Sequence, residues 1–159
     1  MTENILHPWK QETIIRHTQR LLLSYKYWTG KSLLDTDGTP ELIAQALWEA
    51  PFIVFSHGME SDPIYNYGNR KALDLWEVDW EQLTQMPSRY SAEPMEQEER
   101  VRVLNEVTSN GYISNVGGVR VSRSGKRIRV SNFTIWNLLD ENQQKCGQAA
   151  TFNEWEYIQ

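Results

Sequence analysis

The hydrophobic pattern of the chain changes its period along the sequence, and this change is what most constrains the fold. The first third has helical spacing, because Ile14, Leu21, Tyr25 and Trp28 recur at steps of seven, four and three. The region after Gly111 alternates apolar and polar residues, which is typical of antiparallel strands. A chain that begins with helices and ends with strands favours an α+β fold.

Short elements are predicted between these two regions. The apolar run Phe52–Phe55 indicates a buried strand, and Ile64–Tyr67 is its expected hairpin partner. Several helices begin at typical capping residues: Thr39 before Pro40, Asn69, and Asp79 with Gln82. A further helix runs through Val103 and Val107 and stops at Asn110-Gly111.

The C-terminal region predicts three long antiparallel strands. Ser124-Gly125 indicates a tight hairpin turn, and a slip in the alternation at Ser131-Asn132 indicates a bulge. Ala149–Tyr157 is the expected last strand. The predicted fold class is α+β, with a five-stranded antiparallel sheet and helices on one face. We assign residues 1–50 to an N-terminal helical extension and residues 51–159 to the core, as one folding unit.

Composition and charge exclude several classes of protein. The 159 residues suit a single domain, and no run approaches the roughly 18 apolar residues of a membrane span. The first ten residues lack the apolar segment of a secretory signal, so a cytoplasmic protein is expected. Cys146 is the single cysteine, which excludes an internal disulfide and a Cys-clustered zinc site. A net charge of -5 argues against nucleic-acid binding.

The region from residue 120 to residue 129 concentrates positive charge. Its basic residues are Arg120, Arg123, Lys126, Arg127 and Arg129. With a two-residue turn, Arg120 is expected opposite Arg129, and both point away from the core. Like charges opposed across a sheet cost stability, so we expect an offset from the acidic segment 77–106, an acidic protein partner or a bound anion. A solvated sheet edge kept soluble by charge is the alternative.

Four stretches of the chain resemble one known family. They are Ser56–Asn69, Ser88–Pro94, Ser122–Gly125 and Gly147–Phe152. These stretches are similar to the MEKHLA family, which is PAS-related, closes plant class III homeodomain–leucine zipper proteins and also occurs alone in bacteria and algae. The resemblance runs from about Gln11 to the C-terminus. With no homeodomain or zipper in the sequence, it matches a stand-alone, bacterial-type member, and DNA binding does not carry over.

The resemblance implies a PAS-like sensory or regulatory module that binds a small molecule or a protein partner and has no catalysis of its own. In light-sensing PAS relatives, a cysteine after the second strand forms the flavin adduct. The matching region here, Asn66–Leu75, has no cysteine, so such photochemistry is not expected and the cofactor is unknown. Flanking helices of PAS proteins often pair between subunits. The apolar stripe of the first helix therefore predicts a homodimer, unless it packs on its own domain.

In the PAS fold a cavity is expected between the concave face of the sheet and the short helices. Aromatic cavities with a few polar groups are typical small-molecule sites, although the same side chains could fill the space themselves. The expected walls are Phe55, Tyr65, Tyr67, Leu73, Trp76, Phe133, Ile135 and Phe152, with His57, Asn66 and Asn132 as the polar groups.

His57 leaves two interpretations open. It is either a functional group (a general base, a haem ligand or a donor to a bound molecule) or a residue that fixes the strand-to-loop turn. One alternative function is therefore a cofactor-independent enzyme, with His57 and a nearby carboxylate, Glu60 or Asp62, as acid and base. Another is a pure protein-interaction domain that binds an acidic partner through the basic residues of 120–129.

Overall fold

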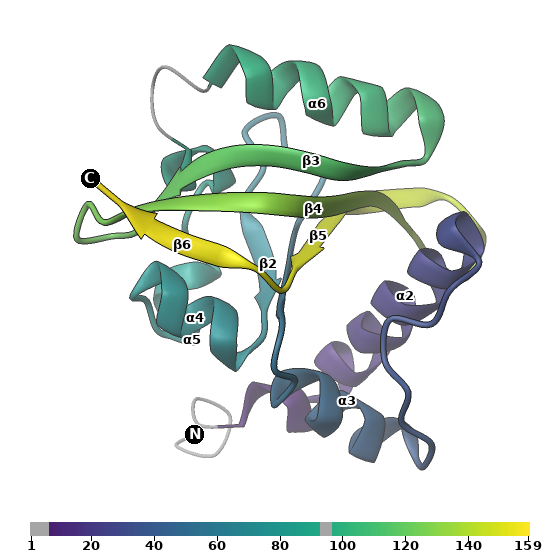
Figure 1. Ribbon diagram of the computed structural model, residues 1–159. Coiled ribbons are helices and arrows are strands. Elements are labelled where there is room, and N and C mark those ends of the chain that lie inside the picture. Colours follow the sequence, from purple (N-terminus) through teal and green to yellow (C-terminus); the bar gives the residue numbers. More distant parts are fainter. Residues whose placement is uncertain (1–6, 93–96) are drawn as a thin grey trace.

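The computed structural model describes residues 7–92 and 97–159, so Glu93 and Pro94 of the quoted Ser88–Pro94 stretch lie outside the described residues. In this part of the chain, one antiparallel sheet has the strand order β2-β1-β5-β4-β3, and β6 also pairs with β4 (Figure 1). The elements in chain order are η1 (Pro8–Lys10), α2 (Glu12–Thr29), α3 (Pro40–Trp48), β1 (Ile53–His57), β2 (Tyr65–Gly68), α4 (Arg70–Trp76), α5 (Trp80–Leu83), η2 (Ser88–Ser91), α6 (Gln97–Asn110), β3 (Tyr112–Val121), β4 (Arg127–Leu139), β5 (Lys145–Phe152) and β6 (Trp155–Ile158).

The predicted capping residues begin their helices. Thr39 and Asn69 accept backbone N–H groups with their side chains, and Asp79 forms a full capping box with Gln82. Gly30 ends α2 in the left-handed conformation, with a φ of 74°, which glycine adopts without steric cost. The local signals in the sequence therefore fix the ends of these helices.

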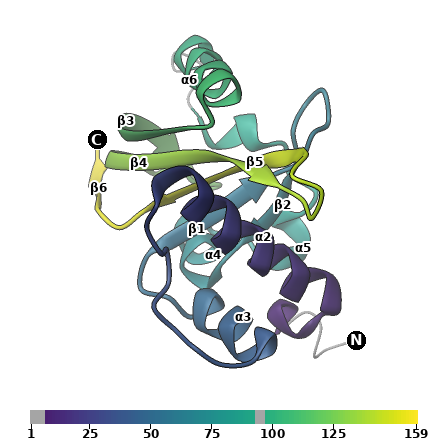
Figure 2. The ribbon, with the colours of Figure 1, turned by 90° about the vertical axis from the view of Figure 1, so that its right-hand side faces the viewer.

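Helices cover both faces of the sheet. The core helices α4, α5 and α6 share one cluster of buried side chains with Phe55 of β1 and Ile135 of β4, so they lie on one face as predicted. The opposite face is covered by α2, which lies across β1 in Figure 2. There Leu21 packs with Trp136, and Tyr25 meets the same indole edge-to-face at 5.0 Å. The apolar stripe of the first helix is therefore used within the chain.

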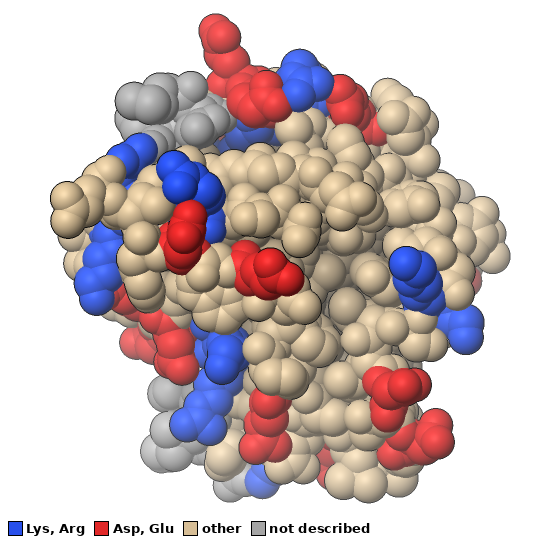
Figure 3. Space-filling view, in the orientation of Figure 1, with Lys and Arg blue, Asp and Glu red and all other residues tan. Residues whose placement is uncertain are grey.

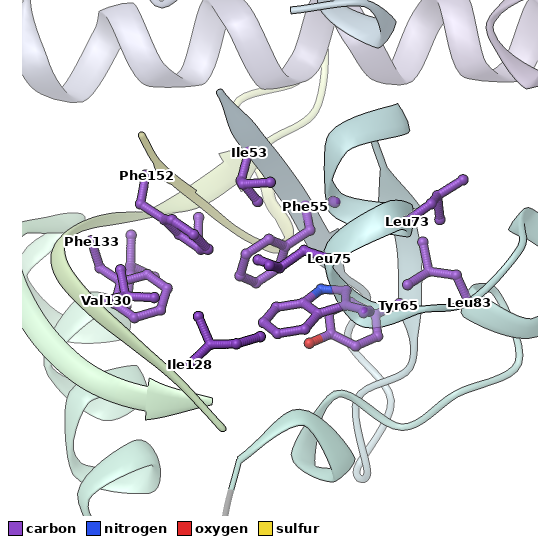
Figure 4. Packing of buried hydrophobic residues seen from close by; sticks show 14 of the residues in the cluster. Ile53, Phe55, Tyr65, Leu73, Leu75, Leu83, Ile128, Val130, Phe133 and Phe152 are labelled. Atoms are coloured by element: carbon purple, nitrogen blue, oxygen red, sulfur yellow. The ribbon is translucent and has the colours of Figure 1, made fainter. Parts of the chain in front are cut away.

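Aromatic side chains fill most of the core between the sheet and α4. The Phe55 ring contacts Tyr65, Trp76 and Phe152 edge-to-face, with centroids 5.7, 5.8 and 6.1 Å apart (Figure 4). Leu73 belongs to the same cluster. Much of the predicted cavity is thus occupied by its own walls, which was the alternative left open by the sequence.

The β3–β4 hairpin has a different register from the predicted one. The backbone N–H of Ser122 donates to the carbonyl of Lys126 at 2.9 Å, so the loop has three residues, Arg123 to Gly125, and ends with Gly125 at a φ of 92°. Arg120 consequently faces Ile128, whereas the two-residue turn had placed it opposite Arg129. A shift of one residue turns every side chain of a strand to the other face. The prediction that Arg120 points away from the core is therefore wrong.

The predicted last strand, Ala149–Tyr157, is divided in the structure. β5 and β6 are separate strands, and both pair with the same edge of β4. β6 pairs with the first part of β4 up to Val130, and β5 pairs with the second part from Thr134. The predicted bulge at Ser131-Asn132 lies between these parts, where β4 has two residues against Gly117 of β3.

Candidate functional site

A cavity of about 40 Å³ lies between the inner face of the sheet, η2 and α6. Part of the predicted pocket lines it: Phe55, His57, Tyr65, Phe133 and Ile135. Its other lining residues were not predicted for the pocket, and they are Ser88, Ser91, Arg100, Leu104, Arg120, Gln148, Ala149 and Ala150. Drug-sized ligands occupy roughly 300–1,000 Å³, so this space suits only a very small molecule or a few waters.

The remaining predicted pocket residues lie elsewhere. Leu73, Trp76 and Phe152 are core residues that do not line the cavity. Asn66 and Tyr67 belong to the opposite face, because the β1–β2 pairing skips Asn66 and this bulge turns Tyr67 away from Tyr65. Asn132 is exposed in the bulge of β4. These three residues are therefore corrections to the predicted site.

His57 has one ring nitrogen bound to the backbone and one without a partner. Its Nδ1 lies 3.0 Å from the carbonyl oxygen of Gly58, as the structural interpretation required. Its Nε2 is buried and has no hydrogen-bond partner in the described part of the chain. Burial lowers the pKa of His57, and the nearby charge of Arg100 lowers it further, so the ring is neutral at pH 7.

The carboxylates that were candidates to orient His57 are engaged elsewhere. Glu60 accepts a hydrogen bond from the backbone N–H of Ile64 at 3.1 Å. Asp62 forms an ion pair with Arg89, also at 3.1 Å. Both act as turn residues, and neither forms the acid–base pair with His57 that the enzyme alternative requires.

The polar end of the cavity carries two guanidinium groups from different elements. Arg100 of α6 donates to the hydroxyl of Ser88, and burial lowers the pKa of Arg100. Arg120 of β3 donates to the carbonyl of Val119 at 3.2 Å and lies over the Phe133 ring. No aspartate or glutamate of residues 7–92 and 97–159 lines this cavity. The spacing of Arg100 from Val103 and Val107, three and seven residues, was the signal that could have placed it on the inner face of α6. The position of Arg120 had no such signal, because it depends on the length of the hairpin loop.

A second polar cluster lies on the opposite face, under α2. The Nε2 atom of His17 lies 2.9 Å from the hydroxyl of Ser56, which donates to Oδ1 of Asn66 at 2.5 Å. Burial lowers the pKa of His17 to about 4. The predicted pocket residue Asn66 is therefore part of the joint between α2 and the sheet.

Acidic residues offset the charge of the basic hairpin. Glu77, the first residue of the predicted acidic segment, lies 3.4 Å from Nζ of Lys126, and Glu156 of β6 lies 3.1 Å from Arg129. Arg127 donates to the carbonyl of Gln159, and Arg123 is exposed. Figure 3 shows acidic and basic side chains interspersed on the side where this hairpin lies. The hairpin is thus a mixed-charge surface.

Residues 7–92 and 97–159 contain neither a candidate metal-binding cluster nor a candidate membrane-spanning helix. No three His, Cys, Asp or Glu side chains gather in a way that could hold a metal ion. No helix in these ranges combines the length and the apolar character needed to cross a membrane.

Comparison with protein families gives a match over nearly the whole chain. The profile of the MEKHLA domain matches residues 15–157. The chain belongs to the MEKHLA family. This MEKHLA domain is 20% identical to homeobox-leucine zipper protein ATHB-9 of Arabidopsis thaliana over 151 residues, covering 92% of this chain and 18% of ATHB-9. It is 22% identical to homeobox-leucine zipper protein HOX9 of Oryza sativa subsp. japonica over 139 residues, covering 85% of this chain and 16% of HOX9. The chain therefore spans less than a fifth of the length of these relatives.

Solved structures share the fold of the MEKHLA domain. A PAS domain from Colwellia psychrerythraea superposes with a TM-score of 0.59 at 16% identity, covering 74% of this chain and 95% of that one. The dark structure of the blue-light photoreceptor Aureochrome1 LOV gives a TM-score of 0.52 at 15% identity, covering 81% and 89%. The MEKHLA domain therefore has a PAS/LOV-like fold, as predicted.

The cavity of this MEKHLA domain does not fit a flavin. The three-ring system of a flavin needs far more than about 40 Å³, and aromatic side chains occupy the space beside the cavity. The helix after the second strand, α4, has the sequence Arg-Lys-Ala-Leu-Asp-Leu-Trp and offers no thiol.

Proposed function

We propose that this MEKHLA domain is a sensory or regulatory module that responds to a very small molecule bound in the cavity between the sheet and α6. The observation that carries the proposal is His57, which is 9% exposed, lines the cavity and has no partner for Nε2 in the described part of the chain. A buried polar atom without a partner costs about 1–3 kcal/mol, which a ligand that binds it would recover.

The helix α6 is the element that a ligand would act on. It supplies Arg100 and Leu104 to the cavity wall. It is held to the sheet by Gln148, which donates to the carbonyl of Leu104 at 3.1 Å, and by Asn137, which donates to the carbonyl of Val107 at 2.9 Å. A ligand in contact with Arg100 would therefore bias the position of α6 on the sheet, as a sensory module requires.

Native mass spectrometry of the purified domain tests this proposal. We expect a small extra mass that is lost on denaturation, and we expect Ala150→Leu, which fills the cavity, to abolish it. Ala72→Leu is the matched control, since Ala72 is buried in α4 and does not line the cavity. Retention of the mass by a folded Ala150→Leu variant would place the ligand elsewhere and contradict the proposal.

The other expectations from the sequence have less support. A purely electrostatic protein interface is disfavoured by the ion pairs of Lys126 and Arg129. A homodimer through the first helix stays a prediction; the side chains that α2 leaves exposed for it are Leu23 and Tyr27. The cytoplasmic location, the stand-alone arrangement and the boundary at residue 50 also stay predictions.

A further inference from the structure

We propose that the domain has a second binding site, a groove beside the β3–β4 hairpin that binds an aromatic molecule with one carboxylate. The groove is separate from the cavity under α6, because only Ser91 lines both of them. The hydroxyl of Ser91 is engaged by Tyr65 and by the carbonyl of Ser88, and these two residues line the cavity. The site is therefore independent of the proposed function.

The groove has the size and the lining of a small-molecule site. It measures about 460 Å³ and lies where α4, α5 and η2 meet the end of β3, at the left of Figure 1. Small-molecule sites measure roughly 300–1,000 Å³ and are mostly apolar. The apolar side chains that line this groove are Trp76, Val78, Met86, Pro87, Tyr90 and Val121. It can therefore hold the body of an organic molecule, which the cavity under α6 cannot.

Arg123 supplies the charge of the groove. It is exposed, and its guanidinium has no hydrogen bond and no ion pair in the described part of the chain. Lys126 and Arg129 of the same hairpin differ from it, because each forms an ion pair with a glutamate. No aspartate or glutamate of residues 7–92 and 97–159 lines the groove. Arg123 is therefore free to bind an anion there, and a guanidinium suits a carboxylate through two parallel hydrogen bonds.

The hairpin loop holds Arg123 at the groove. The backbone N–H of Arg123 donates to the carbonyl of Trp76 at 3.1 Å. The carboxylate of Glu77 accepts hydrogen bonds from the hydroxyl of Ser122 at 2.6 Å and from the backbone N–H of Ser124 at 3.0 Å. These bonds fix the loop on both sides of Arg123, so its side chain starts from a defined position beside the apolar wall.

Tyr90 provides a fixed aromatic surface in the groove. It is 56% exposed, which is unusual for a large apolar side chain. The guanidinium carbon of Arg89 lies 4.5 Å from the centre of the Tyr90 ring, and Asp62 holds Arg89 in an ion pair. A ring that is both exposed and held in place favours contact with another aromatic ring.

An acidic protein segment is the other anion that Arg123 could attract. Several carboxylates on one peptide need several free cations. Among the described residues that line the groove, Arg123 is the one cation, and the neighbouring Arg89 is paired with Asp62. These contacts favour a molecule with a single carboxylate.

Two-dimensional ¹H–¹⁵N NMR titration with 2-naphthoate tests the proposal. Its neutral counterpart 2-naphthamide lacks the charge, and its saturated counterpart decahydro-2-naphthoate lacks the aromatic rings. We expect 2-naphthoate to bind at least about threefold more tightly than either counterpart, because only 2-naphthoate makes both the charge-assisted hydrogen bonds and the aromatic contact.

Substitutions on the groove test each contact separately. Arg123 and Tyr90 are exposed, so their replacement should leave the fold intact. Arg123→Gln should weaken the binding of 2-naphthoate at least about threefold and leave that of 2-naphthamide unchanged. Tyr90→Ala should weaken both at least about threefold. The controls are Arg129→Gln on the same hairpin and Tyr157→Ala, which is 60% exposed on β6, and both should bind as the wild type does.

The wild-type spectrum locates the site without any variant. On addition of 2-naphthoate, the indole N–H signal of Trp76, which lines the groove, should move. The indole N–H signal of Trp136, which is buried under α2, should stay unchanged.

Several outcomes would overturn the proposal. They are no binding of 2-naphthoate, equal binding of either counterpart, an unmoved Trp76 signal at saturation, and wild-type affinity in Arg123→Gln. A hexapeptide of glutamate that bound more tightly than 2-naphthoate would assign the groove to an acidic protein segment and would also overturn it.

Discussion

The guanidinium carbon of Arg120 lies 4.8 Å from the centre of the Phe133 ring, on the inner face of the sheet. This contact is a consequence of the three-residue loop from Arg123 to Gly125, which places Arg120 opposite Ile128. The basic residues of the hairpin therefore differ in role: Arg120 belongs to the cavity, while Arg129 forms an exposed ion pair with Glu156.

Charge reversal of Arg120 and of Arg129 should lower the free energy of unfolding by different amounts. Arg129→Glu is expected to lower the free energy of unfolding by about 1 kcal/mol or less, because exposed ion pairs contribute little. Arg120→Glu should cost about 2 kcal/mol or more, because it replaces the cation over the Phe133 ring with a carboxylate and removes the hydrogen bond to the carbonyl of Val119. Denaturant unfolding of both variants measures the difference. Equal losses would indicate that both side chains point to solvent, as the two-residue turn requires.

Glu77 should determine the order of the hairpin loop and part of its acid sensitivity. Its carboxylate accepts hydrogen bonds from the hydroxyls of Ser122 and Ser124, at 2.6 and 2.5 Å, and from the backbone N–H of Ser124 at 3.0 Å. These bonds lower the pKa of Glu77 to about 2. The unfolded chain therefore binds the proton more readily, and this stabilisation is lost as the pH falls from about 4.5 towards 2.

We expect Glu77→Ala to accelerate amide hydrogen exchange at Ser124 and to reduce the fall in Tm between pH 5 and pH 3. The control Glu81→Ala, at an exposed position of α5, should leave exchange at Ser124 unchanged. If the amide of Ser124 exchanged as slowly in Glu77→Ala as in the wild type, the carboxylate of Glu77 would not order the loop.

His17 should make the joint between α2 and the sheet sensitive to acid. Its pKa is about 4 in the folded chain and 6.5 in the unfolded chain, so the unfolded state binds more protons between these values. Stability is therefore complete above pH 6.5 and falls as the pH decreases to about 4, by at most about 3 kcal/mol. His17→Gln keeps a donor for Ser56 and should remove this part of the pH dependence. Denaturant unfolding of the wild type and of His17→Gln at pH 7 and pH 4.5 measures this difference. If both proteins lost the same free energy of unfolding between pH 7 and pH 4.5, His17 would have no such role.

Asn69 should be the most sensitive capping residue. Its Oδ1 accepts from the backbone N–H groups of Val54 and Ala72, and its Nδ2 donates to the carbonyls of Leu47 and Phe52. Asn69→Asp keeps the shape but loses both donors and buries a charge, so we expect a loss of about 3–5 kcal/mol. Thr39→Ala removes an exposed cap and should cost about 1 kcal/mol. Similar values for the two variants in urea unfolding would contradict this role for Asn69.

The ends of the elements could be predicted from the sequence, because caps and turns are local. Gly30, Thr39 and Asp79 act within a few residues of their own position, and the structure confirms all three. The register of β3 against β4 depends on one residue of loop length, and Ser124-Gly125 fits a loop of two or of three residues equally well.

Which residues of each strand face the cavity was harder to predict than where the cavity lies. The five residues of β1 are all buried, so burial alone could not show that Phe55 faces the cavity and Ser56 faces α2. A bulge at Asn66 separates Tyr65 from Tyr67, which strict alternation places together. Arg100 lies in a helix rich in charge, although its spacing of three and seven residues from Val103 and Val107 places it on their buried face. Its position depends on η2, which brings Ser88 to it across the cavity.

The division of the last strand has a mechanical consequence. β6 is held along one side by β4 alone in the described chain, through the pairs from Arg127–Ile158 to Val130–Trp155. Tension applied at the C-terminal end would break the hydrogen bonds of these pairs one after another, beginning with the pair nearest that end. The chain would then detach from the sheet as far as Asn153-Glu154, while the other strands stayed paired with one another. We therefore expect the last strand to detach first under force, and none of the residues that line the cavity belongs to it.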